Sequence, residues 1–95
     1  MKRYYAIVEG RVQGVGFCSF CIQTAREFGL TGSVRNLSNG MVEIYVQGEA
    51  LKIDAFFAVL KQGDFLIRVD NISQKEVPIE PREKSFVCNY DSSWY

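Results

Sequence analysis

GRVQGVGFC, at residues 10–18, joins two segments whose side-chain periods differ. Residues 4–12 are rich in β-branched and aromatic side chains, as in a half-buried β-strand. After the glycines, apolar side chains recur at helical spacing from Phe17 to Phe28, and Gly29 ends the pattern. The stretch therefore predicts a strand, a glycine-rich turn and an amphipathic helix.

The middle of the chain predicts a hairpin and a second helix. Residues 33–37 and 41–47 have strand character and flank an Asn-Gly pair, which readily takes the positive φ angles of a tight turn. Residues 49–62 then carry a second apolar stripe at helical spacing.

Two further strands are expected in the last third. Residues 65–77 alternate between apolar and polar, with a change of face near Asn71, and residues 85–90 form a short final strand. The order is βαββαβ with a short fifth strand. It predicts an α+β, ferredoxin-like sandwich, in which two helices cover one face of an antiparallel-rich sheet. We expect residues 1–95 to form a single domain, of which residues 91–95 are a C-terminal tail.

The composition excludes several chemistries. The 95 residues include no histidine, which rules out Ser-His-Asp and Cys-His nucleophiles and His-ligated zinc or iron. The three cysteines are too few for a four-thiolate zinc site. We expect no metal and no cofactor.

The charge is balanced in total but not along the chain. A net charge of zero argues against a nucleic-acid partner. Residues 1–36 carry five basic and two acidic side chains, or +3, and residues 37–95 carry six and nine, or −3. This predicts an anion site in the first third, although a chain this small also reaches such an imbalance by chance.

The expected location is the cytoplasm. The apolar run at residues 4–8 is too short for a signal peptide, and no stretch approaches transmembrane length. An odd number of cysteines is typical of free thiols in a reducing compartment. We therefore expect a cytoplasmic monomer without a membrane partner.

The turn at residues 10–18 is a candidate anion cradle. Glycines let successive backbone N–H groups point inward, and the helix N-terminus adds unpaired N–H groups and partial positive charge. The turn is not a Walker loop, because no Gly-Lys-Ser/Thr follows, and it lacks the third glycine of a dinucleotide fingerprint. On spacing alone, an ordinary strand–helix turn is the alternative.

The same residues resemble a known family. GRVQGVGF at residues 10–17 is similar to the acylphosphatase signature. The segment at residues 32–43 matches the second motif, G-x-V-x-N-x-x-x-G-x-V-E, and Gln47-Gly48 fits the pattern that follows. The resemblance extends over residues 4–90 and implies metal-free hydrolysis of the carboxyl-phosphate bond of small acyl phosphates.

The resemblance also implies roles for individual residues. The phosphoryl group would be held by the backbone N–H groups of Gln13, Gly14, Val15, Gly16, Phe17 and Cys18. Asn36 would orient the attacking water, and an arginine directly after the signature phenylalanine would clamp the phosphate. The expected partners are a small acyl phosphate, inorganic phosphate or sulfate.

Cys18 stands where the family has that arginine. A thiol cannot supply a bidentate, permanently charged fork to phosphate. We therefore predict a phosphate cradle with weak or lost turnover. The alternative is a catalytically silent anion-binding domain.

Other functions stay open from the sequence. Arg11 or Arg35 could replace the missing cation, although strand alternation predicts that Arg35 and Asn36 face opposite sides. Cys18 and Cys21 form a C-x-x-C at a helix start, where a redox role is conceivable, but Cys21 lies on the apolar stripe. An RNA-recognition fold shares the element order, but its aromatic motif belongs on the third strand. Cys88 is expected in the core.

Overall fold

The computed structural model describes residues 1–89, so the predictions for residues 90–95 lie outside the described part of the chain. The elements confirm the predicted order with its fifth strand. They are β1 (Lys2–Arg11), α1 (Phe17–Glu27), β2 (Thr31–Asn36), β3 (Val42–Gly48), α2 (Ala50–Gln62), β4 (Arg68–Val77) and β5 (Phe86–Cys88).

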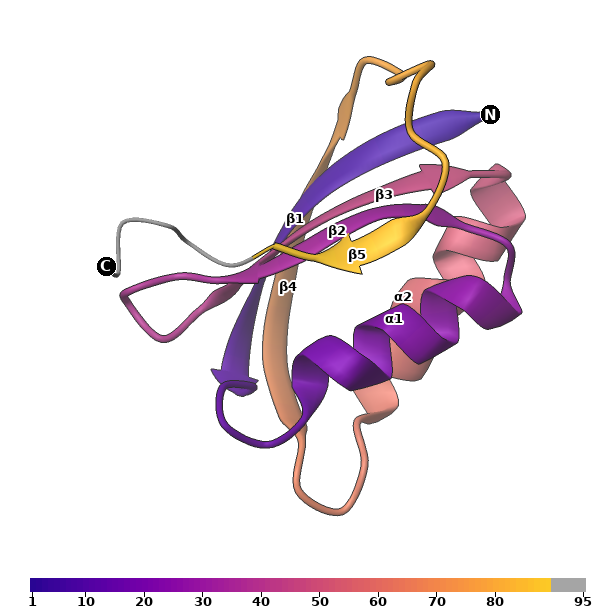
Figure 1. The fold of residues 1–95 in the computed structure, drawn as a ribbon. Coiled ribbons are helices and arrows are strands. Elements are labelled where there is room, and N and C mark those ends of the chain that lie inside the picture. Colours follow the sequence, from indigo (N-terminus) through magenta and orange to yellow (C-terminus); the bar gives the residue numbers. More distant parts are fainter. Residues whose placement is uncertain (90–95) are drawn as a thin grey trace.

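The five strands form one mixed sheet in the order β4-β1-β3-β2-β5. The pairs β1–β3, β1–β4 and β2–β3 are antiparallel, and β2–β5 is parallel. Both helices lie on the same face of this sheet (Figure 1). The predicted ferredoxin-like α+β fold is confirmed.

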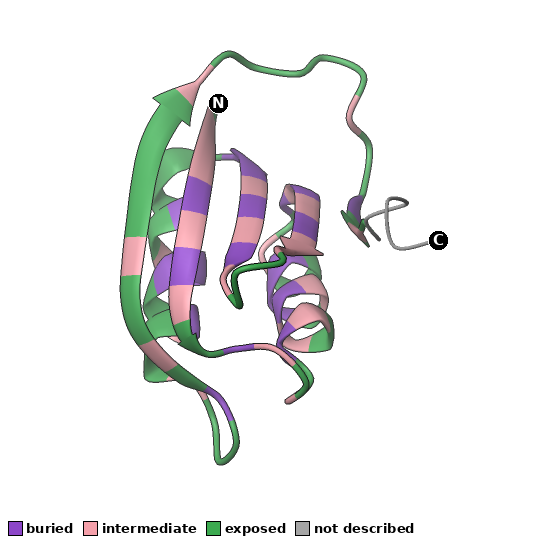
Figure 2. Cartoon of the chain, turned by 90° about the vertical axis from the view of Figure 1, so that its left-hand side faces the viewer, coloured by how far each residue is buried: buried purple, intermediate pink, exposed green. Residues whose placement is uncertain are grey.

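The core lies between the sheet and the two helices. Along β1 and β3, buried and half-buried residues alternate (Figure 2). Ala6 and Val8 of β1 are fully buried, whereas Tyr5 and Ile7, on either side of Ala6 in the sequence, face the side without helices. The helices contribute their predicted apolar stripes to one cluster, which consists of Ala6, Val8, Val12, Phe17, Cys21, Ala25, Leu30, Val34, Val42, Ile44, Val46, Ile53, Phe56, Phe57, Leu60, Ile67 and Phe86.

The predicted strand start at residue 65 is wrong, because β4 begins at Arg68. The Asp64 carboxylate accepts the backbone N–H groups of Leu66 (2.8 Å) and Ile67 (3.0 Å), which closes a turn instead. Ile67 is buried while Phe65 is fully exposed. The alternating apolar residues Phe65 and Ile67 therefore lie in a turn and not in a strand.

The change of face expected near Asn71 corresponds to an irregularity in the β1–β4 pairing. Glu9 is opposite Asn71 but Gly10 is opposite Val69, so Asp70 has no partner on β1. An extra residue on one strand is a β-bulge, which reverses the faces of the residues beyond it.

The last strand is shorter than predicted. Phe86–Cys88 is assigned as β5, whereas the expected strand covered residues 85–90, of which residue 90 is not described. Ladder-like hydrogen bonds continue for one residue on each side. The Gly32 N–H donates to the Ser85 carbonyl (3.0 Å), and the Asn89 N–H donates to the Val34 carbonyl (2.8 Å).

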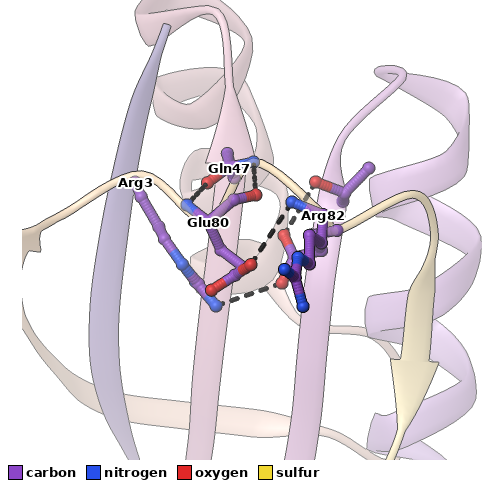
Figure 3. A network of polar contacts seen from close by, with 6 residues as sticks. Arg3, Gln47, Glu80 and Arg82 are labelled. Carbon is purple, nitrogen blue, oxygen red and sulfur yellow. Dashed lines mark hydrogen bonds and ion pairs between the residues drawn. The ribbon is translucent and has the colours of Figure 1, made fainter.

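A polar network holds the β4–β5 connection across the end of the sheet (Figure 3). The buried Gln47 amide accepts the Glu80 N–H (2.8 Å) and donates to the Glu80 carbonyl (3.1 Å). Arg3 pairs with Glu83 at 3.1 Å. These contacts lie at the start of β1, opposite the glycine-rich turn, and they place β5 beside β2.

Among residues 1–89, no helix is long and apolar enough to cross a membrane.

Candidate active site

The glycine-rich turn joins β1 to α1 (Figure 1). Gly14 and Gly16 have φ angles of 73° and 81°, in the left-handed region. Val15 between them has a negative φ, because no non-glycine residue of the described chain has a positive one. This alternation of sign points successive N–H groups toward one side, as in the concave nests that bind anions.

These two positions require glycine because of their backbone conformation and not because of close packing. A Cβ atom at Gly14 or Gly16 would meet nothing within 4 Å. Residues other than glycine adopt a left-handed φ only at a cost in conformational energy. The space beside the turn is therefore open to a ligand.

The first turn of α1 adds its own N–H groups. Gly16 is the N-cap residue, and no side chain caps the helix or places a carboxylate in its first turn. The N–H groups of Phe17 and Cys18 therefore have no helical partner, and they lie at the positive end of the helix dipole. The six backbone positions predicted from Gln13 to Cys18 thus run from the turn into the first two residues of α1.

The Gln13 side chain has a role that the sequence did not reveal. Its amide nitrogen donates to the carbonyls of Leu37 (2.7 Å) and Met41 (2.9 Å), on the hairpin that joins β2 to β3. The same two residues are also joined by the Leu37 N–H, which donates to the Met41 carbonyl (2.9 Å). Gln13 therefore ties the glycine-rich turn to the end of β2, where Asn36 lies.

We expect Gln13→Ala to destabilise the protein, because it leaves two half-buried carbonyls without their side-chain donor. The expected loss of unfolding free energy is about 1–3 kcal/mol. Urea unfolding measures it, with Gln23→Ala on the exposed side of α1 as the control. Equal midpoints for Gln13→Ala and the unmodified chain would show that this contact adds nothing to stability.

Cys18 and Asn36 lie next to each other. The Cys18 thiol donates to Asn36 Oδ1, with 3.7 Å between sulfur and oxygen. Asn36 ends β2 and shares the helix-covered face with the buried Val34 two residues earlier. The structure thus brings the residue expected to hold water beside the position of the missing arginine.

The Cys18 thiol is neutral at physiological pH. Burial, together with the neighbouring Cys88 thiol, raises the pKa of Cys18 to about 12. Burial also raises the pKa of Cys21 well above its usual value, and the Cys21 side chain is fully buried in the core. Reactive C-x-x-C pairs have lowered pKa values and exposed sulfurs, so these features are opposite to those of a thiol oxidoreductase.

The two arginines considered as replacements have different surroundings. Arg35 pairs with Glu43 at 3.1 Å on the sheet face without helices, where Tyr5 also donates to the same carboxylate (2.9 Å). It is therefore held away from Asn36, as strand alternation predicted. Arg11 is exposed at the end of β1, and within residues 1–89 it forms no ion pair.

The position of Cys88 was predicted only in part from the sequence. It was expected in the core, and it does pack against the core, but it is half-exposed and lies beside Cys18. Seventy residues separate the two sulfurs in sequence (88 minus 18), and no local pattern joins them. In the described part of the chain, no group of three or more His, Cys, Asp or Glu side chains could hold a metal ion.

Comparison with known proteins gives one consistent relationship. The acylphosphatase family model matches residues 4–88. An acylphosphatase of Clostridium beijerinckii is 44% identical over 90 residues, which cover 95% of this chain and 100% of that protein.

Solved structures agree in fold. The acylphosphatase of Bacillus subtilis superposes with a TM-score of 0.89 at 36% identity, covering 95% of this chain and 100% of that one. HypF of T. kodakarensis superposes with a TM-score of 0.83 at 39% identity, covering 97% of this chain and 12% of the longer HypF chain. The chain therefore belongs to the acylphosphatase family, whose members are hydrolases that act on acyl phosphates.

Proposed function

We propose that this acylphosphatase-family chain binds the phosphoryl group of a small acyl phosphate in the turn from Gln13 to Cys18. Asn36 holds the water that attacks phosphorus. Turnover is weak, because Cys18 supplies no cationic clamp. The observation that carries this proposal is the contact between Cys18 and Asn36, 3.7 Å apart beside an open turn with alternating φ signs.

The cradle supplies charge stabilisation without a metal. Backbone N–H groups of the turn and of the first turn of α1 donate to the phosphoryl oxygens. These donors are fixed by the fold before the substrate arrives, so no reorganisation is needed as charge develops. The neutral Cys18 thiol adds no negative charge that would repel the anion, because its pKa is about 12.

Asn36 positions the nucleophile. Its side-chain oxygen accepts a hydrogen bond from the attacking water and so holds that water in line with the acyl oxygen that leaves. The amide does not titrate, so its role is orientation and not general base catalysis. In the unmodified chain the Cys18 thiol already donates to this oxygen, and a water must share the acceptor or displace that weak donor.

The missing cation limits the reaction. The transition state of phosphoryl transfer spreads charge over three equatorial oxygens, and arginine matches two of them with parallel donors. A chain that binds phosphate in the cradle and hydrolyses acyl phosphates no faster than free solution is the second candidate, a silent anion-binding domain. Because position 18 carries a cysteine and not the arginine, both weak turnover and a silent anion-binding domain are favoured over an efficient enzyme.

We further propose that the protein acts as a cytoplasmic monomer with one domain over residues 1–95. The buried apolar side chains of residues 1–89 form one cluster, which supports one domain. The Bacillus subtilis acylphosphatase supports it as well, since the match covers the whole of that chain.

The experiment is the hydrolysis of a generic acyl phosphate, such as benzoyl phosphate, by the purified chain and by Arg11→Met. We expect slow hydrolysis, with the two rates within about twofold, because Arg11 is exposed and an exposed, solvated charge contributes little. Arg26→Met, an exposed position in the last turn of α1, is the matched control for lost charge.

Two results would contradict this expectation. Fast hydrolysis by the unmodified chain would mean that the proposal of impaired turnover is wrong. Fast hydrolysis that Arg11→Met abolishes and Arg26→Met preserves would identify Arg11 as the replacement clamp.

A further inference from the structure

The fold brings Cys18 and Cys88 together from distant parts of the sequence. β5 pairs in parallel with β2, and Cys88 is opposite Val34. Phe86, two residues before Cys88 on the same face, is buried against the helices. Cys88 therefore faces α1, which lies over β2 and β5 (Figure 1).

Cys18 reaches the same place from the helix. Its sulfur is 3.7 Å from Asn36 Oδ1, and Asn36 lies two residues beyond Val34 on the same face of β2. The Cys18 and Cys88 side chains therefore converge on the same part of this face, and both are half-exposed. Cys21, by contrast, is fully buried.

We propose that Cys18 and Cys88 are a modification site, a dithiol that small-molecule disulfides convert into an intramolecular disulfide. One protein thiolate attacks oxidised glutathione and releases one glutathione thiolate. The second protein thiolate then attacks the mixed disulfide and releases the other. The two protein sulfurs are oxidised, oxidised glutathione is reduced to two glutathione molecules, and the two protons of the protein thiols are transferred to them.

The environment of the sulfurs makes this bond slow to form at neutral pH. Burial disfavours the Cys18 thiolate, whose pKa is about 12, so few molecules attack at neutral pH.

The bond would change the candidate site in two ways. It would fix the first turn of α1 to β5, a strand of three residues at the edge of the sheet. It would also remove the thiol hydrogen that Cys18 donates to Asn36, leaving Oδ1 free to accept from water. Cys88 would thus act on the candidate site through its bond to Cys18.

The test is disulfide mapping of the native, unmodified chain, which does not depend on acyl phosphate hydrolysis. The protein is incubated with oxidised glutathione without denaturant, quenched in acid, alkylated, digested and analysed by mass spectrometry. We expect the number of alkylated cysteines to fall from three to one, with a linked peptide pair that contains Cys18 and Cys88. The rate of this loss is expected to rise with pH.

The Cys21→Ser variant is expected to form the same link, and Cys88→Ser is expected to form none. A link between Cys18 and Cys21 in the unmodified chain would overturn the proposal. Loss of two thiols in Cys88→Ser, or accumulation of glutathione adducts without any internal link, would overturn it as well. Cys88→Ser keeps the Cys18 thiol but cannot form the bond, so in this variant Cys18 continues to donate to Asn36 in the presence of oxidised glutathione.

Discussion

Cys18→Arg is expected to raise the rate of acyl phosphate hydrolysis by roughly 10³- to 10⁵-fold, the range over which arginines contribute to phosphoryl transfer. The guanidinium would start from the first turn of α1, beside the open cradle and next to Asn36. From there its two parallel donors could bind the phosphoryl oxygens as charge develops on them. The expected gain is therefore in kcat.

The matched control is Cys18→Gln, which adds length and hydrogen-bond donors without charge. Initial rates with benzoyl phosphate compare the two variants with the unmodified chain, and thermal unfolding checks that both are folded. If Cys18→Gln gains as much as Cys18→Arg, removal of the thiol from Asn36 and not the new charge explains the gain. If neither variant gains, position 18 is not where the clamp is missing.

Asn36→Ala, made together with Cys18→Arg, is expected to lower kcat by roughly 10²-fold, the cost of losing the alignment of a reacting group. KM is expected to change little, because Asn36 contacts the water and not the phosphate. Asn71→Ala is the matched control, since Asn71 is exposed on β4 at the far edge of the sheet.

A rise in KM without a fall in kcat would assign Asn36 to substrate binding instead. An unchanged kcat would remove Asn36 from the reaction altogether. A fall in kcat with an unchanged KM and an unchanged stability indicates a role in the reaction. A merely structural defect would instead lower the stability together with kcat. Unfolding in urea therefore accompanies the kinetics.

Much of the fold follows from local patterns in the sequence. The apolar stripe that includes Phe17 and Cys21 predicted α1, and both residues are buried. The Asn-Gly turn predicted the hairpin, in which the Asn39 side chain accepts the Met41 N–H (3.0 Å). Such elements are predictable because the side-chain period and the turn chemistry agree with the tertiary structure.

The errors arise where apolar alternation has another cause. Phe65 and Ile67 alternate as in a strand, but Gly63 has a φ of 63° and the Asp64 carboxylate binds the backbone of the next residues. A turn that a single side chain closes leaves the same pattern of apolar residues as a strand. The parallel pairing of β5 with β2 depends on the long connection after β4 and has no local signal.

Some features of the candidate site could likewise be predicted from the sequence, and others could not. The glycines, Asn36 and the absence of the arginine are visible in the sequence, because motif spacing carries them. The Gln13 contact to the β2–β3 hairpin and the approach of Cys88 to Cys18 are not visible, since they join residues 24 to 70 positions apart. Contacts of this range are set by the topology of the whole domain.

The central claim, that the turn from Gln13 to Cys18 holds a phosphate, is tested most directly by titrating the isotope-labelled chain with inorganic phosphate and following backbone amide shifts by NMR. The predicted result is that the largest saturable shifts occur at Gly14 through Cys18. The N-terminus of α2 is an internal control, because it also lacks a side-chain cap but directly follows β3 and not a glycine-rich turn. Equal shifts at both helix starts, or no saturable shifts in the turn, would contradict the account.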